Sequence, residues 1–100
     1  MKKTLRQKQS KFAFMVSDLI KFAYANGYEL TLGDAYAHSG HKEGSFHYKR
    51  LAIDLNLFRE GRYLTTTEDH KPLGNFWKSI GGSWGGEFRH SDGNHYSLGE

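Results

Sequence analysis

Residues 48–58 read YKRLAIDLNLF. Two sets of side chains alternate along this segment: Leu51, Ile53, Leu55 and Leu57 on one face, and Ala52, Asp54, Asn56 and Phe58 on the other. A period of two is typical of a β-strand, whose successive side chains point to opposite faces. The segment is therefore the strongest predicted strand of the chain, and the rest of the fold is predicted outward from it.

Three shorter strands are predicted around this segment. The turn at Glu60-Gly61 leads into a short partner strand, 62–64, and alternation also predicts strands at 28–32 and 94–98. The polar, glycine-punctuated residues 33–44 are expected to form a loop, and 84–86 a compact turn.

Two helices complete the prediction. The first segment carries an apolar stripe at three- and four-residue spacing and ends before Gly27; the stripe consists of Phe12, Met15, Leu19, Phe22 and Ala23. A second helix is predicted over about 68–80, after threonines that can cap it, with Pro72 near its first turn. The order of elements predicts a small α+β domain with an antiparallel sheet.

Composition limits the classes of function. One hundred residues make one domain, 1–100, without room for a separate wall-binding domain. The chain has no cysteine, which excludes thiolate nucleophiles and Cys-bound zinc. A net charge of +3 suits nucleic acid or another anionic polymer such as cell wall without choosing between them. The run 11–25 is interrupted by polar residues, so we expect neither a signal peptide nor a membrane span.

Three side chains of the types that bind zinc lie on or beside the predicted strands: His47, Asp54 and His95. A zinc hydrolase uses three protein ligands, drawn from imidazole and carboxylate, and an open position for water. Two hairpin-related strands can bring such residues together. Residues seven apart in an ideal strand face opposite sides, so His47 must lie on a bend before the strand proper if it shares a metal with Asp54.

Spacing alone leaves other interpretations open. Asp54 can simply point to solvent from the outer strand face, and each histidine can be an ordinary surface or hydrogen-bonded residue. Four more histidines compete as ligands: His38, His41, His70 and His90. Asp92, three residues before His95, can take a proton from water that a metal has activated, or it can belong to an Asp-Gly-Asn turn.

Four residues carry a family resemblance: Ser45, His47, Ala52 and Asp54. They match the Ser-x-His-x-x-x-x-Ala-x-Asp motif of a zinc peptidase family, that of D-Ala-D-Ala carboxypeptidases and phage L-alanyl-D-glutamate endopeptidases. Asp92-x-x-His95 followed by Tyr96 resembles the second motif of this family. The segment 84–86 is similar to the Trp-Gly-Gly turn of its phage endolysin branch, and 33–36 resembles the segment before its first motif. The resemblance covers about residues 28–98.

The resemblance implies a site and a reaction. His47, Asp54 and His95 would bind Zn²⁺, Asp92 would be the general base and acid, and Ser45 would form a hydrogen bond near the site. The reaction would be amide hydrolysis in the peptide stems of peptidoglycan. The implied fold is the small α+β fold shared by D,D-peptidases and hedgehog signalling domains.

One departure from the family concerns the substrate carboxylate. Many relatives carry an arginine just after the aromatic residue of the 33–36 segment, where this chain has Ala37. Arg50 stands where glycine is common, and its guanidinium can grip a carboxylate, although it can equally be a surface arginine of the strand.

The sequence thus predicts a monomeric phage or prophage endolysin that acts on peptidoglycan stems, without a nucleic-acid partner. Lacking a signal peptide, it would stay in the cytoplasm until holin-type export releases it to the wall. Other classes remain open: a small metal-dependent nuclease, a zinc-stabilised wall-binding module without catalysis, and a structural phage protein.

Overall fold

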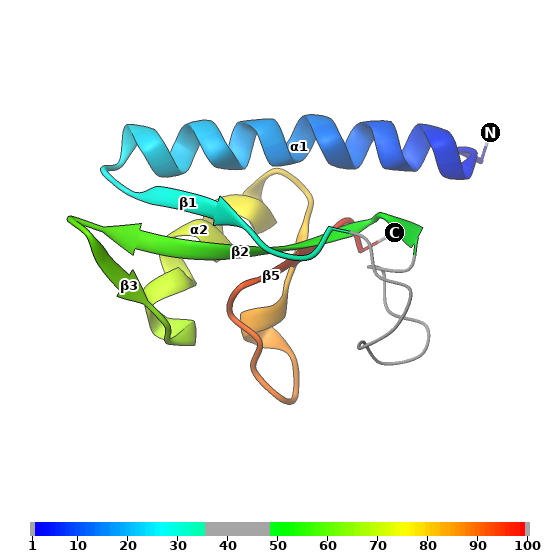
Figure 1. The fold of residues 1–100 in the computed structure, drawn as a ribbon. Coiled ribbons are helices and arrows are strands. Elements are labelled where there is room, and N and C mark those ends of the chain that lie inside the picture. Colours follow the sequence, from blue (N-terminus) through cyan, green and yellow to red (C-terminus); the bar gives the residue numbers. More distant parts are fainter. Residues whose placement is uncertain (1, 36–48, 100) are drawn as a thin grey trace.

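The computed structural model describes residues 2–35 and 49–99. Its elements in chain order are α1 (Leu5–Ala25), β1 (Glu29–Leu32), β2 (Ala52–Arg59), β3 (Arg62–Leu64), α2 (Thr67–Ser79), β4 (Ser83–Trp84), the short 3-10 helix η2 (Gly85–Glu87) and β5 (His95–Ser97). The five strands form one antiparallel sheet in the order β1-β2-β5-β4, and β3 also pairs with β2. The predicted α+β class with an antiparallel sheet is confirmed (Figure 1).

Strand β2 is the centre of the sheet. Its residues 55–58 pair with β1, 57–59 pair with β3 in a hairpin, and 52–54 pair with β5. The chain reaches β5 only after β3, α2 and β4, so no hairpin joins β2 and β5, and the hairpin relation predicted from the sequence is wrong. Their pairing is a long-range contact, which no local sequence signal marks.

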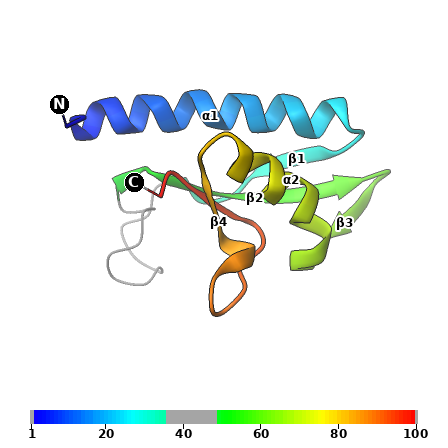
Figure 2. The ribbon, with the colours of Figure 1, turned by 180° about the vertical axis from the view of Figure 1, so that it is seen from behind.

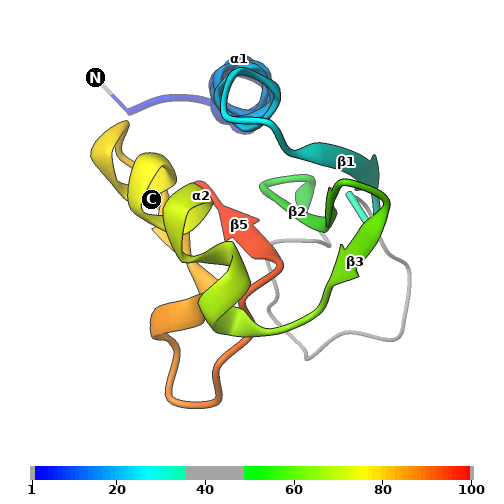
Figure 3. The same ribbon diagram turned by 90° about the vertical axis from the view of Figure 1, so that its left-hand side faces the viewer.

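The two faces of β2 have opposite characters. Leu55 and Leu57 are fully buried, as are the α1 residues Leu19 and Ala23 that contribute to the same core. Asp54, Asn56 and Phe58 on the other face are half-buried. Figures 1 and 2 show α1 running lengthwise over one face of the sheet, and Figure 3 shows α2 beside β5. The opposite face, called the open face below, carries the polar side chains of β2.

The helices form where capping and apolar spacing predict them. Thr4 caps α1 and Thr66 caps α2, each through a capping box. Phe22 of α1 stacks on Phe76 of α2, with ring centroids 4.3 Å apart. No helix in ranges 2–35 and 49–99 is long and apolar enough to cross a membrane.

Three local predictions are corrected. Pro72 is the sixth residue of α2 rather than a first-turn residue, so it removes the helical hydrogen bond to the Glu68 carbonyl. The long strand begins at Ala52 rather than residue 48, because Arg50 adopts a left-handed conformation with φ +58°. Trp84, predicted to begin a turn, instead forms a short strand with Ser83 that pairs with β5, since pairing with a distant strand sets their conformation.

Candidate metal centre

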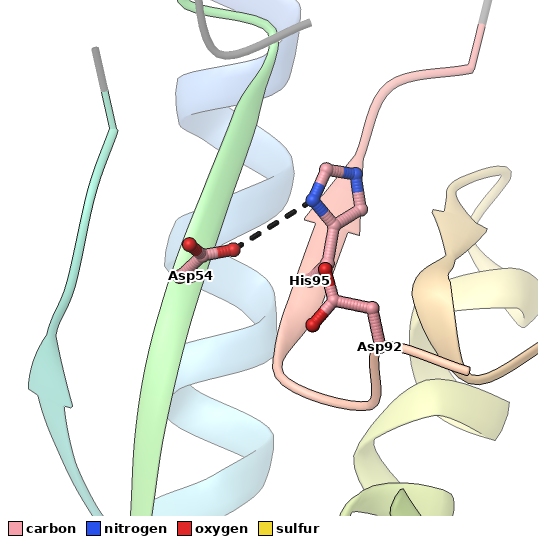
Figure 4. A group of neighbouring side chains, drawn as sticks. All are labelled: Asp54, Asp92 and His95. Carbon is pink, nitrogen blue, oxygen red and sulfur yellow. Dashed lines mark ion pairs between the residues drawn. The ribbon is translucent and has the colours of Figure 1, made fainter. Parts of the chain in front are cut away.

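The centre of the site is a cross-strand pair on the open face. Asp54 of β2 and His95 of β5 are register partners, and directly opposed residues of antiparallel strands point to the same face. Asp54 Oδ1 lies 3.6 Å from His95 Nδ1 (Figure 4). Their side chains are 20% and 10% exposed, so an ion held here would be partly shielded from bulk solvent.

The backbone of Asp54 is fixed on both edges of β2. Its carbonyl accepts a hydrogen bond from the Gly33 N–H at 2.8 Å, and its N–H donates to the Asp34 carbonyl at 2.9 Å. On the other edge, the Leu55 N–H donates to the Asn94 carbonyl at 2.9 Å. These bonds fix the position of the Asp54 backbone in the sheet, so its carboxylate lies beside the start of β5.

Asp92 joins the pair from the turn that precedes β5. Its N–H donates to the Gly85 carbonyl at 2.9 Å, and its carbonyl accepts from the His95 N–H at 3.1 Å. This closed turn brings the Asp92 carboxylate beside Asp54 and His95, and one ligand atom from each residue lies within 4.8 Å of the others (Figure 4). Asp92 is the exposed member of the three.

Trp84 and two glycines support the turn. The Trp84 indole N–H donates to the Gly93 carbonyl at 2.8 Å in the interior. A Cβ on Gly85 would lie 2.2 Å from the Asp92 carbonyl oxygen and 2.8 Å from His95 Cβ, and one on Gly86 would overlap the Trp84 ring. The Trp-Gly-Gly sequence therefore has a physical reason, because only residues without side chains allow this approach.

Two aromatic residues lie next to His95, Phe88 on the open face of the sheet and Tyr96 on the core side. On the open face, the exposed ring of Phe88 lies 5.2 Å from the His95 ring, centroid to centroid. Tyr96 points into the core, where its hydroxyl lies 2.8 Å from Nδ1 of buried His70. Burial lowers the pKa of His70 to about 4 and raises the pKa of Tyr96 above its usual value, so both are neutral at pH 7. Phe88 was not identified from the sequence, which carries no signal for this contact.

Apart from Arg50, the predicted site residues fall into three groups. Asp54, Asp92 and His95 come together as the only cluster of metal-binding side chains within residues 2–35 and 49–99. His70 and His90 are outside it, His70 because it faces the core and bonds Tyr96. The other predicted residues lie outside the described part of the chain: Ser45, His47 and the competing His38 and His41.

Arg50, predicted to bind a substrate carboxylate, is exposed at the bend just before β2. Residues 47 and 54 would face opposite sides only if one regular strand joined them. The regular strand begins at Ala52, so this objection to a metal shared by His47 and Asp54 does not apply.

The donor set fits a divalent ion. Two carboxylates and one imidazole are ligands that zinc accepts, and their atoms lie close enough for a single ion to bridge them. With only two or three protein ligands from this cluster, a coordination position remains for water or substrate.

The fold and the cluster together define a small α+β domain with a candidate metal site on the open face of its sheet. Residues 39–98 match the family model described as D-alanyl-D-alanine carboxypeptidase, which covers more than half of the chain. The chain therefore belongs to the D-alanyl-D-alanine carboxypeptidase family, a family of metal-dependent peptidases, as its motifs predicted. A search of curated proteins gave no match.

Proposed function

We propose that this protein is a zinc-dependent hydrolase that cleaves an amide bond in the peptide stems of peptidoglycan. The observation that carries the proposal is the convergence of Asp54, Asp92 and His95 within 4.8 Å in a chain of this peptidase family. His47, Asp54 and His95 are proposed as the zinc ligands, with His47 assigned from its motif alone. A bound zinc ion supplies a Lewis acid that polarises the amide carbonyl and makes water nucleophilic at neutral pH.

Burial supports different roles for the two carboxylates. Asp54 is half-buried and held on both edges of its strand, which suits a fixed ligand. Asp92 is exposed at the rim of the same cluster, where its carboxylate can reach both water and substrate. We assign Asp92 as the general base that accepts the proton of the attacking water and then passes it to the departing amine.

Two further roles extend this proposal. Arg50 is proposed to bind a substrate carboxylate, because a guanidinium can form two parallel hydrogen bonds with it. Ser45 is proposed to form a hydrogen bond near the substrate. The biological role is proposed to be that of a phage or prophage endolysin, supported by the endolysin-like Trp-Gly-Gly turn and consistent with a net charge of +3, which suits an anionic wall.

The test is mass spectrometry of fragments released from purified peptidoglycan, with zinc-loaded protein, with chelator, and after zinc is restored. We expect cleavage of one stem bond that chelation abolishes and zinc restores. Zinc-loaded protein that is inert on every peptidoglycan would contradict the proposal and favour a non-catalytic wall-binding module. Cleavage of plasmid DNA with magnesium, without action on the wall, would favour a nuclease.

The endolysin role has its own test. Added to chloroform-treated bacteria, the wild-type protein should lower the turbidity of the suspension, and Asp92→Asn should not. Turbidity that stays constant while purified stems are cleaved would place the enzyme in wall metabolism rather than lysis.

A further inference from the structure

Four side chains extend the open face of the sheet beyond Asp54: Thr31, Asn56, Phe58 and Tyr63. We call this set the sheet-face platform. Thr31 is the register partner of Asn56, and Phe58 that of Tyr63, so each pair points to one face. Asp54, Asn56 and Phe58 alternate along β2, which puts the platform on the face that carries the metal centre.

The aromatic part of the platform is a stacked pair. The rings of Phe58 and Tyr63 lie 5.1 Å apart between centroids with 26° between their planes. Tyr63 is 56% exposed, although a tyrosine ring gains free energy from burial. An exposed, preformed aromatic surface beside a functional site is typical of ligand contact.

The polar part of the platform borders this aromatic pair. The Asn56 amide donates to the Thr31 hydroxyl at 3.2 Å, and its oxygen accepts from the Tyr63 hydroxyl at 3.4 Å. This chain of hydrogen bonds fixes the orientation of the amide, while the groups keep further donor and acceptor capacity for a ligand. The platform therefore combines a flat apolar surface with oriented amide and hydroxyl groups.

A pyranose ring is complementary to such a surface. Its C–H bonds can lie against the electron-rich face of an aromatic ring, while its hydroxyl and acetamido groups form hydrogen bonds at the edge. Along β2 the platform begins roughly 7 Å from Asp54 and ends roughly 13 Å away, at about 3.3 Å per residue. About four extended peptide residues span the larger distance.

We infer that the sheet-face platform binds an amino-sugar ring of the glycan strand while the attached peptide stem reaches the metal centre. This inference rests on the proposed function and adds the sugar as a second recognised part of the substrate. It makes Tyr63 and Asn56 determinants of specificity for stems that are still linked to glycan.

The experiment compares two substrates, a free stem peptide and the same stem joined to its disaccharide. Tyr63→Ala should lower kcat/KM on the disaccharide-linked stem about three- to tenfold, as loss of an aromatic contact does, and leave the free stem unchanged. Tyr63→Phe keeps the ring and should lose much less. The matched control is Phe14→Ala, which removes a similarly exposed aromatic ring from α1. Equal kcat/KM for wild type and Tyr63→Ala on the linked stem would overturn the inference, and so would an equal loss on both substrates.

A binding measurement separates this inference from the proposed function. Zinc-free protein is sedimented with purified cell-wall sacculi, and the bound fraction is compared for wild type, Tyr63→Ala and Phe14→Ala. Weaker binding of Tyr63→Ala alone supports the platform even if no stem bond is cleaved, in which case only the proposed function fails. Equal binding of all three proteins rejects the platform whatever the enzyme cleaves.

Discussion

Asp54 and His95 stand opposite each other on neighbouring antiparallel strands, with Asp54 Oδ1 3.6 Å from His95 Nδ1 (Figure 4). They are 41 positions apart in the sequence, and the pairing of β2 with β5 brings them together. Because both strands belong to the core-packed sheet, the pair is held by the fold rather than by a loop. A metal ion placed between them would bind to a preformed site.

His95→Ala is expected to lose zinc. The variant removes the buried imidazole of the cluster, one of the three proposed zinc ligands, and the two ligands that remain are too few for a zinc site. Zinc content after dialysis, measured by atomic absorption, checks this. The control is His90→Ala, whose exposed side chain lies outside the cluster and whose loss should leave zinc content unchanged. Stoichiometric zinc in His95→Ala would refute its assignment as a ligand.

Asp92→Asn is expected to keep zinc and lose turnover. The amide matches the carboxylate in size but cannot accept a proton, so the rate should fall by about 10²-fold or more. Zinc content and the rate of stem cleavage, measured on the same preparation, test the two halves of the prediction. Loss of zinc from this variant would show that Asp92 is a ligand rather than the base.

Gly85→Ala is expected to destabilise the fold and weaken zinc binding. The new Cβ would meet the Asp92 carbonyl oxygen and His95 Cβ, so the turn must move and the unfolding free energy should drop by about 1–3 kcal/mol. Ser91→Ala, at an exposed position of the loop that follows η2, is the control and should stay within about 0.5 kcal/mol of wild type. Urea unfolding of the zinc-free proteins measures the stability of both variants, and zinc content after dialysis measures the loss of zinc binding. A Gly85→Ala variant as stable as Ser91→Ala would contradict the crowding described for this turn.

The stability of the zinc-free protein is expected to decrease in acid through His70. Its side chain is 3% exposed, and burial lowers its pKa from 6.5 to about 4, while the charge of Asp69 acts weakly in the opposite direction. Below pH 6.5 the His70 imidazole is protonated in the unfolded chain but stays neutral in the folded chain until the pH approaches 4. The contribution of His70 to the free energy of unfolding is therefore complete above pH 6.5 and is lost as the pH falls towards 4, by about 3 kcal/mol at most.

The measurement is urea unfolding between pH 4 and 7, followed by the fluorescence of buried Trp77 and Trp84. His70→Gln should flatten the pH dependence relative to wild type, because glutamine does not titrate. His90→Gln, which changes an exposed histidine, should reproduce the wild-type slope. Identical slopes for wild type and His70→Gln would show that His70 does not titrate in this way.

Local chemistry allowed much of the fold to be predicted from the sequence. Alternating Leu55 and Leu57 predict the central strand, and the apolar spacing of Leu19 and Ala23 predicts α1, because these patterns depend only on the periods of strand and helix. The two family motifs likewise identified the peptidase family, and Asp54, Asp92 and His95 as site candidates. Residues of a motif keep their spacing whatever the tertiary arrangement.

Only the tertiary structure brought those candidates together and separated them from His70 and His90. Nothing near His70 in the sequence says that it faces Tyr96 in the core, while nothing near Asp54 says that it pairs with His95. Local sequence patterns also do not predict three other features: the start of β2 at Ala52, the strand β4, and the contact of the platform residue Tyr63 with Asn56. The physical reason is the same in each case: strand register and side-chain contact are fixed by burial of one sheet face against distant segments, which is a property of the whole chain.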